Sequence, residues 1–341
     1  MYQTNTDISR IKKLLTEGKQ DILILSHRNP DGDAVGASLA LYNLFLKLGH
    51  NAEILIPNSF PSFLKWMKNA GKIRIYDNNP EAAAKILVRA KIVFALDFND
   101  LSRIREFNDI LKSTDSYKVL IDHHPEPQNF ADLTISDPKA SSTAELIYDF
   151  IGDLGLISSI DADIASCLFA GIMTDTGCFS FNSSQPLTYN KVASLITCGI
   201  DKDYIYDRVY NNFSFNRMRL MGYCLDKKLV CLPEYRTAYI TLTQQEMRNY
   251  NFRVGDSEGF VNLPLSIEGI RFSVLFVEKK DMIKLSFRSK GNFEVNKIAV
   301  DHFKGGGHKN ASGGESYDSL ENTVDKFIKL LPAYKDELLS K

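Results

Sequence analysis

Residues 21–33 read DILILSHRNPDGD, and this stretch decides the fold that we expect. It begins with a continuous apolar run, which is typical of a strand buried on both faces. The run ends in His27, Asp31 and Asp33, on a turn that contains a proline and a glycine. Apolar residues then recur at helical spacing over residues 34–48. The stretch therefore predicts a buried strand, a polar turn and a helix, in that order.

The same form recurs along the first half of the chain. Residues 51–57 predict a second strand and residues 60–69 a helix. Residues 91–97 and 118–123 are again apolar runs that end in ionisable side chains. Strands that alternate with helices indicate an α/β fold with a doubly wound, mainly parallel sheet. Because ligands of such sheets bind beyond the carboxyl ends of the strands, we expect the ionisable side chains to gather at one edge.

Two further helices and a polar helical segment follow. Residues 142–145, STAE, have the form of a capping box that opens a helix. An apolar helix over residues 161–172 leads to Asp175. From residue 188 to 226 the helical pattern is more polar, and we interpret this segment as a connector between two domains.

The second half of the chain predicts a smaller α+β domain. Its elements are a strand at 237–243, a hairpin of strands at 270–277 and 283–289, and helices at 294–303 and 319–331. A chain of 341 residues exceeds the usual size of one hydrophobic core, which also favours two domains. We expect a first domain at residues 1–187, a helical connector at 188–228 and a second domain at 229–341.

Charge and hydropathy exclude several classes of protein. The chain has 41 Lys and Arg against 42 Asp and Glu, too balanced for a protein that coats long duplex nucleic acid. The halves differ, because residues 1–190 carry 18 basic and 23 acidic side chains and residues 191–341 carry 23 and 19. No stretch of about 18 apolar residues and no signal-peptide pattern occur. We therefore expect a cytoplasmic protein without a membrane partner.

Six residues at these strand and helix ends have side chains of the kind that bind metals: His27, Asp31, Asp33, Asp97, His123 and Asp175. Taken singly, each has an ordinary explanation as a helix cap, a turn residue or a structural histidine. Four ionised carboxylates that converge on one edge would repel one another, and divalent cations would relieve that repulsion. Carboxylate and imidazole ligands suit Mn²⁺, with Mg²⁺ or Co²⁺ as substitutes. The five cysteines form no CxxC pair, which disfavours a thiolate zinc site.

Four short motifs carry a resemblance to a known family. They are HRNPDGDAVG at 27–36, Asp97 at a strand end, DHH at 122–124 and TDTG at 174–177. In this order they resemble the motifs of the DHH phosphoesterase superfamily, and residues 288–314 resemble its DHH-associated C-terminal domain. The resemblance implies a catalytic, metal-binding domain at residues 1–187 and a substrate-binding domain at residues 229–341. It is closest to the short two-domain members of the NrnA type, which are oligoribonucleases and pAp phosphatases.

The resemblance also implies roles for the candidate residues. It assigns one cation to His27, Asp31 and Asp97, and a second cation to Asp33, Asp97, His123 and Asp175, so that Asp97 bridges the two. Water activated by such a pair of cations attacks phosphorus in line. The catalytic group would be completed by Asp122, which fixes a histidine tautomer, and by His124, which faces the substrate.

A glycine-rich segment in the second half is a candidate phosphate site. Three consecutive glycines allow backbone N–H groups to converge on an anion, although a tight turn after the helix is the favoured explanation of the glycines taken alone. The resemblance implies that a substrate phosphate is bound by Arg288, Gly305, Gly306, Gly307 and His308. Lys304 and Ser312 stand where the family pattern has glycine and alanine, so the geometry of the segment differs in detail.

We therefore expect a metal-dependent phosphohydrolase of short nucleotides, such as nanoRNA, linear dinucleotides like pApA, or pAp. Its partners would be short oligoribonucleotides or small phosphorylated nucleotides, and the sequence leaves a homodimer open. An exopolyphosphatase or pyrophosphatase that uses the same metal site is the alternative enzyme. A non-catalytic nucleotide-binding regulator is the alternative from another class. Phe179, Phe181 and Tyr317 are candidates for a base pocket, but core packing explains each more simply.

Overall fold

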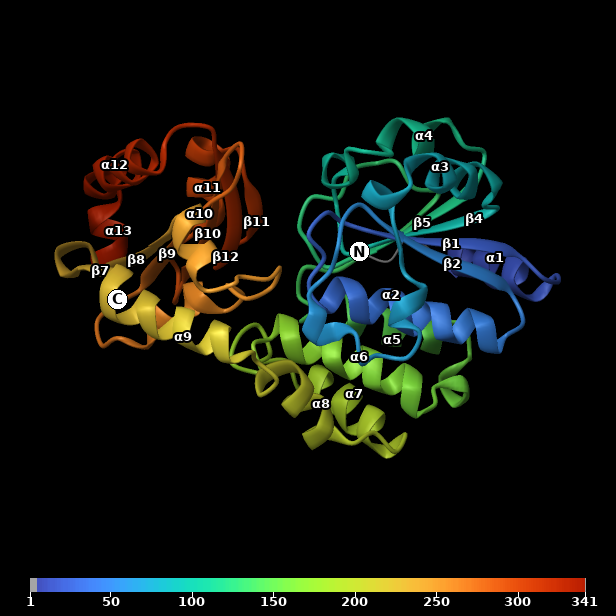
Figure 1. The fold of residues 1–341 in the computed structure, drawn as a ribbon. Helices are drawn as coiled ribbons and strands as arrows, with labels where there is room; N and C mark the ends of the chain where they lie inside the picture. Colours follow the sequence, from blue (N-terminus) through green and yellow to red (C-terminus); the bar gives the residue numbers. More distant parts are fainter. Residues whose placement is uncertain (1–4, 341) are drawn as a thin grey trace. The chain divides into compact units, whose positions relative to one another are not determined.

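A computed structural model gives the structure of residues 5–340, with side chains described from residue 8 onward. The chain divides into two compact units at the boundary between Asn212 and Phe213. Figure 1 shows the elements of both units, coloured along the sequence. Among the helices of residues 5–340, none is both long enough and apolar enough to cross a membrane.

The first unit is built on a six-stranded sheet in which every strand is parallel to its neighbours. In spatial order the strands are β3 (Arg74–Ile75), β2 (Asn51–Ile56), β1 (Asp21–Ser26), β4 (Ile92–Leu96), β5 (Tyr117–Asp122) and β6 (Leu133–Ser136). The doubly wound α/β sheet expected from the sequence is thus confirmed. From β1 the strand order runs through β2 to β3 on one side, and on the other side through β4 and β5 to β6. A sheet whose order reverses in this way opens a crevice at the carboxyl ends of the two central strands.

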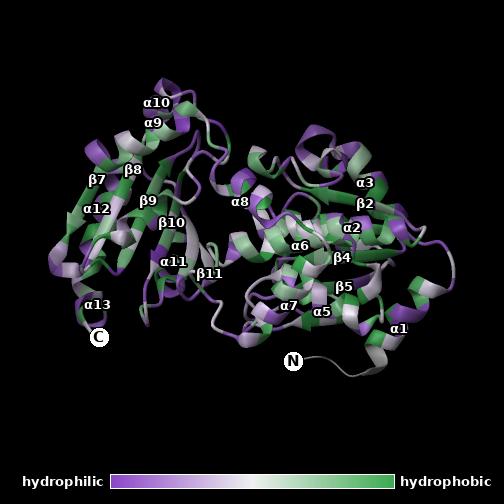
Figure 2. Ribbon diagram, turned by 90° about the horizontal axis from the view of Figure 1, so that it is seen from below, coloured by the Kyte–Doolittle hydropathy of each residue, from purple (hydrophilic) through white to green (hydrophobic). Residues whose placement is uncertain are grey.

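Helices cover both faces of this sheet because both sets of alternating strand residues are apolar. One face carries α1 (Asn5–Thr16), α2 (Gly32–Lys47), α5 (Thr143–Asp153) and α6 (Ala162–Asp175), and the other carries α3 (Pro80–Arg89) and α4 (Asn108–Ser113) (Figure 1). Ile24 and Phe94 are buried against the first group, and Leu25 and Ala95 against the second. Figure 2 shows the strands β2, β4 and β5 as hydrophobic ribbons between more polar helices.

The expected helix at residues 60–69 is wrong. This segment forms two short 3-10 turns, Ser62–Leu64 and Ala70–Lys72, and Asn69 between them has a left-handed backbone with φ 64°. Leu64 and Met67 are nevertheless buried in the core of the unit. Their helix-like spacing therefore reflects the packing of a turn-rich segment.

The expected capping box at the start of α5 is only half formed. The Ser142 hydroxyl accepts a hydrogen bond from the Glu145 N–H at 3.1 Å, so Ser142 is the N-cap. The Glu145 carboxylate does not bind back to Ser142, because it accepts from the N–H and the hydroxyl of Ser141 instead. It also accepts a hydrogen bond from Lys191 at 2.8 Å.

The segment that we expected to be a connector, residues 188–228, is divided between the two units. It contains α7 (Pro186–Thr197), α8 (Lys202–Tyr210) and α9 (Phe215–Tyr223), and the breaks fall near Gly199 and Asn211, as the sequence predicts. α7 and α8 bury apolar side chains such as Leu195 and Ile205 in the core of the first unit. In contrast, α9 buries Leu220 in the second unit. Packing, and not polarity along the chain, therefore decides where the boundary falls.

The second unit is built on a mixed six-stranded sheet. In spatial order its strands are β11 (Gly306–His308), β12 (Ala311–Ser316), β10 (Ile283–Ser289), β9 (Phe272–Glu278), β8 (Thr237–Leu242) and β7 (Leu229–Leu232). β8 and β9 are parallel and the other pairs antiparallel, which confirms the predicted hairpin of β9 and β10 and the α+β class. The helices of this unit are α9, α10 (Gln244–Asn249), α11 (Val295–Phe303), α12 (Leu320–Leu330) and α13 (Lys335–Leu339).

The glycine-rich segment of this unit is not simply a loop. Gly306, Gly307 and His308 form the edge strand β11, which pairs antiparallel with β12. A Cβ at Gly305 would lie 1.9 Å from the carbonyl oxygen of Gly313, and one at Gly307 would lie 2.7 Å from that of Ala311. Side chains are therefore excluded at two of the three glycines by backbone packing. A Cβ at Gly306 would meet nothing within 4 Å.

Candidate metal centre

The candidate metal ligands lie at the crevice where the strand order of the first sheet reverses. His27 follows β1 directly, and Asp97 follows β4, its neighbour in the sheet. Asp31 is the N-cap of α2, because its Oδ1 accepts hydrogen bonds from the N–H groups of Asp33 and Ala34, both at 3.0 Å. Asp31, and not Asp33, is thus the helix cap. The Asp31 carboxylate also belongs to a group of possible ligand atoms with His27 and Asp97.

Asp33 binds the N-terminus of a neighbouring helix. Its carboxylate accepts hydrogen bonds from the backbone N–H of Thr143 at 2.6 Å and of Ala144 at 2.8 Å, in the first turn of α5. A helix N-terminus stabilises a negative charge in this position. Gly171 of α6 makes the approach feasible, since a Cβ there would lie 2.6 Å from the Ala144 Cβ and 3.0 Å from Asp33 Oδ1.

Asp97 lies between the two histidines. Its Oδ2 is 3.3 Å from His27 Nε2, and its Oδ1 is 3.6 Å from His123 Nε2. The Thr143 hydroxyl donates a hydrogen bond to the same Oδ1 at 2.9 Å. The Asp97 side chain is 2% exposed, so water does not compete for these contacts. One carboxylate thus presents a separate oxygen to each imidazole.

Both imidazoles are oriented by main-chain carbonyl groups. His27 Nδ1 donates a hydrogen bond to the carbonyl of Arg28 at 2.9 Å, and His123 Nδ1 donates one to that of Ala140 at 3.4 Å. In this tautomer Nε2 of each ring presents a lone pair to carboxylate oxygens. For His123 the nearest is Asp175 Oδ2 at 3.4 Å. A lone pair that faces a carboxylate is unfavourable by itself and is the arrangement expected around a cation.

The ligand atoms form two groups, and the atoms of each lie within 4.8 Å of one another. The groups are His27, Asp31 and Asp97, and Asp33, His123 and Asp175. All six expected residues are therefore brought to one edge of the sheet, although Asp175 is the last residue of α6 and not a loop residue. Carboxylate and imidazole donors without a thiolate suit divalent cations such as Mn²⁺. The residues present thus fit the metal site that their types suggest.

The electrostatics of the two central carboxylates differ. Burial, together with the neighbouring charges of Asp97, Asp175 and Asp31, raises the pKa of Asp33 well above its ordinary value. For Asp97 burial acts in the same direction, but the close contact with His27 and the positive charge that the nearby imidazoles can carry hold its pKa below the ordinary value. The strain at Asp33 is of the kind that a bound cation relieves, because the cation replaces carboxylate repulsion by attraction.

His124 is oriented differently from His123. Its Nδ1 is 2.7 Å from Asp122 Oδ1, so the first residue of the DHH motif is the partner of the third. Its Nε2 is 3.3 Å from Nη1 of Arg103. Burial opposes the charged form of His124, but the hydrogen bond and charge of Asp122 outweigh it and raise the pKa of the ring. The side chain of Asp122 is fully buried.

Two of the expected phosphate-binding residues of the second unit, Arg288 and His308, lie on the two strands that flank β12. Arg288 of β10 and His308 of β11 are both paired with Ala311 of β12, which lies between them. Directly paired residues of antiparallel strands point to the same face, so both side chains project on one side of the sheet, about 10 Å apart. Arg288 lies on the less buried face of β10, opposite the core residue Phe287. The register thus brings a guanidinium and an imidazole to one face.

Comparison with known proteins identifies the family of the chain. A family model described as the DHH family, N-terminal domain, matches residues 21–172, and a model of the DHHA1 domain matches residues 237–336. A solved structure of an exopolyphosphatase-related protein from Bacteroides fragilis is 42% identical, with a TM-score of 0.93, over 99% of this chain and 98% of that chain. The chain belongs to the DHH family. It is a phosphoesterase of the type that its relatives represent.

The curated relatives of this DHH chain include two bacterial enzymes. The bifunctional oligoribonuclease and PAP phosphatase NrnA of Thermus thermophilus is 29% identical over 96% of this chain and 93% of the relative. The probable enzyme of the same name from Streptococcus mutans is 27% identical over 88% of this chain and 91% of the relative. RecJ of Thermus thermophilus, solved in complex with Mn²⁺, is 13% identical with a TM-score of 0.53. The match covers 99% of this chain and 56% of the RecJ chain, and at this identity it shows a shared fold alone.

We call the six candidate ligands, together with Asp122 and His124, the DHH centre. Sequence reasoning missed three residues that contact it or shape it. Thr143 contacts both Asp33 and Asp97, Gly171 permits the approach of Asp33 to α5, and Arg103 contacts His124. The STAE motif could have indicated Thr143, because a helix N-terminus near a carboxylate cluster attracts one of its members. Nothing in the local pattern indicated the other two, since their contacts are with distant parts of the chain.

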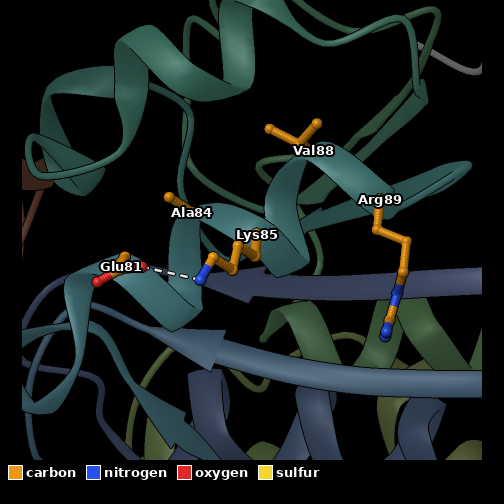
Figure 3. Close-up of a pocket in the computed structure, with 5 residues that line it drawn as sticks. All are labelled: Glu81, Ala84, Lys85, Val88 and Arg89. Carbon is orange, nitrogen blue, oxygen red and sulfur yellow. Dashed lines mark hydrogen bonds and ion pairs between the residues drawn. The ribbon is translucent and has the colours of Figure 1, made fainter.

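A shallow surface depression on α3 is separate from the DHH centre (Figure 3). It is lined by Glu81, Ala84, Lys85, Val88 and Arg89. Lys85 binds Glu81 at 2.8 Å, and the side chain of Arg89 binds Glu53 at 2.5 Å. Lys85 and Glu81 form an exposed pair on one helix face, and Arg89 joins α3 to Glu53 of β2. Surface pairs of this kind contribute little stability.

Proposed function

We propose that this protein is a metal-dependent phosphohydrolase that cleaves phosphodiester or phosphomonoester bonds of short nucleotides. The observation that carries the proposal is the Asp97 carboxylate between two imidazole Nε2 atoms, each oriented by a main-chain carbonyl. The curated relatives are named oligoribonuclease and PAP phosphatase, which supports short RNA and pAp as substrates. Linear dinucleotides such as pApA are part of the same proposal.

In this proposal the six residues hold two divalent cations. One cation is held by His27, Asp31 and Asp97, and the other by Asp33, Asp97, His123 and Asp175. The first set and the trio Asp33, His123 and Asp175 are each grouped in the structure, and Asp97 is added to the second set because its Oδ1 lies 3.6 Å from His123 Nε2. When bound, the cations, which we propose to be Mn²⁺ with Mg²⁺ or Co²⁺ as substitutes, would neutralise phosphoryl charge and lower the pKa of water. The Mn²⁺ complex of RecJ is consistent with this choice of metal.

Other residues of the chain handle the substrate. Asp122 holds Nδ1 of His124, so Nε2 is fixed in direction. In the charged form of the ring, which does not accept a hydrogen bond from Arg103, Nε2 can donate a proton to the leaving oxygen. In the second unit, Arg288 and His308 project on one face and supply donors for a phosphate of the substrate. The backbone at Gly306, where a side chain would meet nothing, leaves room for an anion beside them.

A second candidate is an exopolyphosphatase or pyrophosphatase that uses the same centre. The similar structure from Bacteroides fragilis favours it, because that protein is described as exopolyphosphatase-related. A non-catalytic regulator is disfavoured by membership of a phosphoesterase family and by ligand-competent side chains at every expected position.

A screen of metals against substrates tests the proposal. The purified chain, stripped of metal and supplied with Mn²⁺, Mg²⁺ or Co²⁺, is assayed on pAp, pApA, RNA of two to five nucleotides, and polyphosphate. We expect release of nucleotide or phosphate from the nucleotide substrates, abolished in Asp97→Asn. Turnover of polyphosphate alone would support the second candidate, and no turnover with any metal would contradict both.

A further inference from the structure

Arg103 is a cation without a carboxylate partner beside the DHH centre. It lies in the short 3-10 helix Leu101–Ile104, six residues after Asp97. Its Nη1 is 3.3 Å from His124 Nε2. Within residues 8–340, no carboxylate lies within ion-pair distance of its guanidinium. A half-buried arginine that is left unpaired at the rim of a site is placed to bind an anion that the protein does not supply.

The neighbouring acidic side chains are already paired. Arg28, on the adjacent loop, binds Glu106 and also Asp77, the latter at 3.4 Å. Those carboxylates thus neutralise Arg28, while Arg103 has the imidazole of His124 as its one side-chain partner among the side chains of residues 8–340. The two arginines therefore differ: Arg28 joins loops through its ion pairs, whereas Arg103 keeps N–H donors that no carboxylate among the described residues engages.

Several hydrogen bonds join the segment before Arg103 to the loop that follows His124. The Asn99 side chain donates to the carbonyl of Pro125 at 2.6 Å, and the Gln128 N–H donates to the carbonyl of Asn99 at 2.8 Å. The Gln128 amide also donates to Asp100 at 2.7 Å and accepts from the Leu101 N–H at 3.2 Å. The loop that carries the arginine is thus tied to the loop that carries the histidine.

The same segment is tied to the loop of metal-type residues after β1. The N–H of Arg28 donates to the carbonyl of Arg103 at 2.9 Å, immediately after His27. The segment that carries Arg103 is therefore hydrogen-bonded to the loops that follow β1 and β5. Fixed donors of this kind stabilise developing charge without reorganisation, which is the main way that enzymes stabilise a transition state.

The hydrogen-bond roles at His124 follow from the chemistry of arginine. A guanidinium only donates, so Nε2 of His124 accepts from Arg103 and its Nδ1 donates to Asp122. We propose that Arg103 is a phosphate-binding residue of the centre, which donates to a non-bridging phosphoryl oxygen and orients His124 toward the same group. The identity of the anion rests on the proposed function, and the placement of Arg103 does not.

Kinetics and phosphate binding of the full-length protein test this inference. The variants are Arg103→Ala, Arg103→Lys and, as a matched control on the same segment, the exposed Arg105→Ala. With Mn²⁺ and pAp, we expect Arg103→Ala to lower kcat about 100-fold, as for loss of one donor to a transition state, with a smaller change in KM. Arg103→Lys keeps the charge but not the planar fork and should fall between. Arg105→Ala should keep wild-type kinetics.

Two further measurements separate a chemical role from a structural one. Guanidinium added to Arg103→Ala should restore part of its activity, and should not restore that of Asp97→Asn. Calorimetry with inorganic phosphate on the Mn²⁺-loaded protein should show weaker binding to Arg103→Ala than to wild type. Equal kcat and equal phosphate affinity in Arg103→Ala and wild type would overturn the inference. If wild type turns over no nucleotide, the proposed function fails, but an Arg103-dependent phosphate affinity would still support this inference and its absence would overturn it.

Discussion

Asp97 combines an unusual backbone conformation with a central place in the metal centre. Its φ of 63° lies in the left-handed region, which asparagine and aspartate adopt more readily than other residues with a side chain. Such a conformation costs on the order of 1–3 kcal/mol and is found where the surrounding structure enforces it. Here the Asp97 N–H is fixed by a hydrogen bond to Ile121 of β5 at 3.1 Å. The turn directs the carboxylate toward both His27 and His123.

The hydroxyl of Thr143 should matter for turnover and not for folding alone. It donates to Asp97 Oδ1, and thereby fixes the oxygen that faces His123. We predict that Thr143→Val lowers kcat about 10-fold and the free energy of unfolding by about 1 kcal/mol, because a single buried hydrogen bond is lost. Thr143→Ser retains the hydroxyl and should keep most of both. Steady-state kinetics and urea unfolding check this, and a larger loss in the serine variant would assign the effect to the methyl group.

Asp33 should give the metal-free protein a characteristic dependence on pH. Because burial and nearby carboxylates raise its pKa in the folded state, the unfolded chain releases this proton first. The resulting loss of folded-state stability is absent below the unfolded pKa of about 4 and grows as the pH rises above it. We predict that Asp33→Asn removes this loss, so that its stability relative to wild type increases from pH 4 to pH 7.

Urea unfolding in a chelator, at several pH values, measures this difference. Asp226→Asn is the control, since Asp226 is exposed. A constant difference between Asp33→Asn and wild type at all pH values would contradict the raised pKa. Mn²⁺ should reverse the sign of the difference at neutral pH, because the cation needs the charge that the variant lacks.

At the scale of whole elements, the close packing of α5 against α6 sets the position of Asp33, one of the candidate metal ligands. Gly171→Ala should disturb the N-terminus of α5 and the carboxylate of Asp33 together, because the added Cβ would lie 2.6 Å from Ala144 Cβ. We predict a loss of about 1–3 kcal/mol in stability, as for overpacking, together with weaker Mn²⁺ binding. Gly152→Ala, within α5, is the matched control.

The control has ordinary contacts, since the nearest atom to a Cβ at Gly152 is 3.5 Å away. It should stabilise the helix by about 0.5–1 kcal/mol and leave Mn²⁺ affinity unchanged. Calorimetric titration and thermal unfolding measure both variants. Normal Mn²⁺ affinity in Gly171→Ala would show that the helix contact does not set the position of Asp33.

At the scale of the whole molecule, the two units should respond differently to metal. All six ligand candidates belong to the first unit, and each unit has a hydrophobic core of its own. Binding to the folded state stabilises it by about 2.7 kcal/mol per site at a free-metal concentration 100 times Kd. We predict that Mn²⁺ raises the unfolding temperature of the first unit and leaves that of the second unchanged.

Differential scanning calorimetry of the full chain, with Mn²⁺ or with a chelator, tests this. Asp97→Asn should lose most of the shift in the first transition, because the carboxylate shared by both proposed sites is lost. A shift of equal size in both transitions would mean that the two units unfold together or that metal also binds the second unit.

The sequence by itself determined the strands and the kinds of ligand. Apolar runs such as residues 92–96, set between helical segments, are typical of buried strands of a parallel sheet, and a parallel sheet brings the residues after its strands to one edge. His27 and Asp97 could thus be predicted to meet, because local patterns carried the information. The helix expected at residues 60–69 failed for the converse reason, since burial of Leu64 and Met67 imitates helical spacing in a segment of turns.

Only the tertiary structure decided which side chain faces which. Asp33 and Thr143 are 110 positions apart in sequence, and Asp97 and Thr143 are 46 apart. No local pattern records these pairs, because each depends on the close approach of helices that small residues such as Gly171 allow. The same holds for Arg103 and His124, whose loops are joined by hydrogen bonds. The sequence therefore specified a metal-binding edge, and packing turned that edge into oriented imidazoles, a shared carboxylate and an unpaired guanidinium.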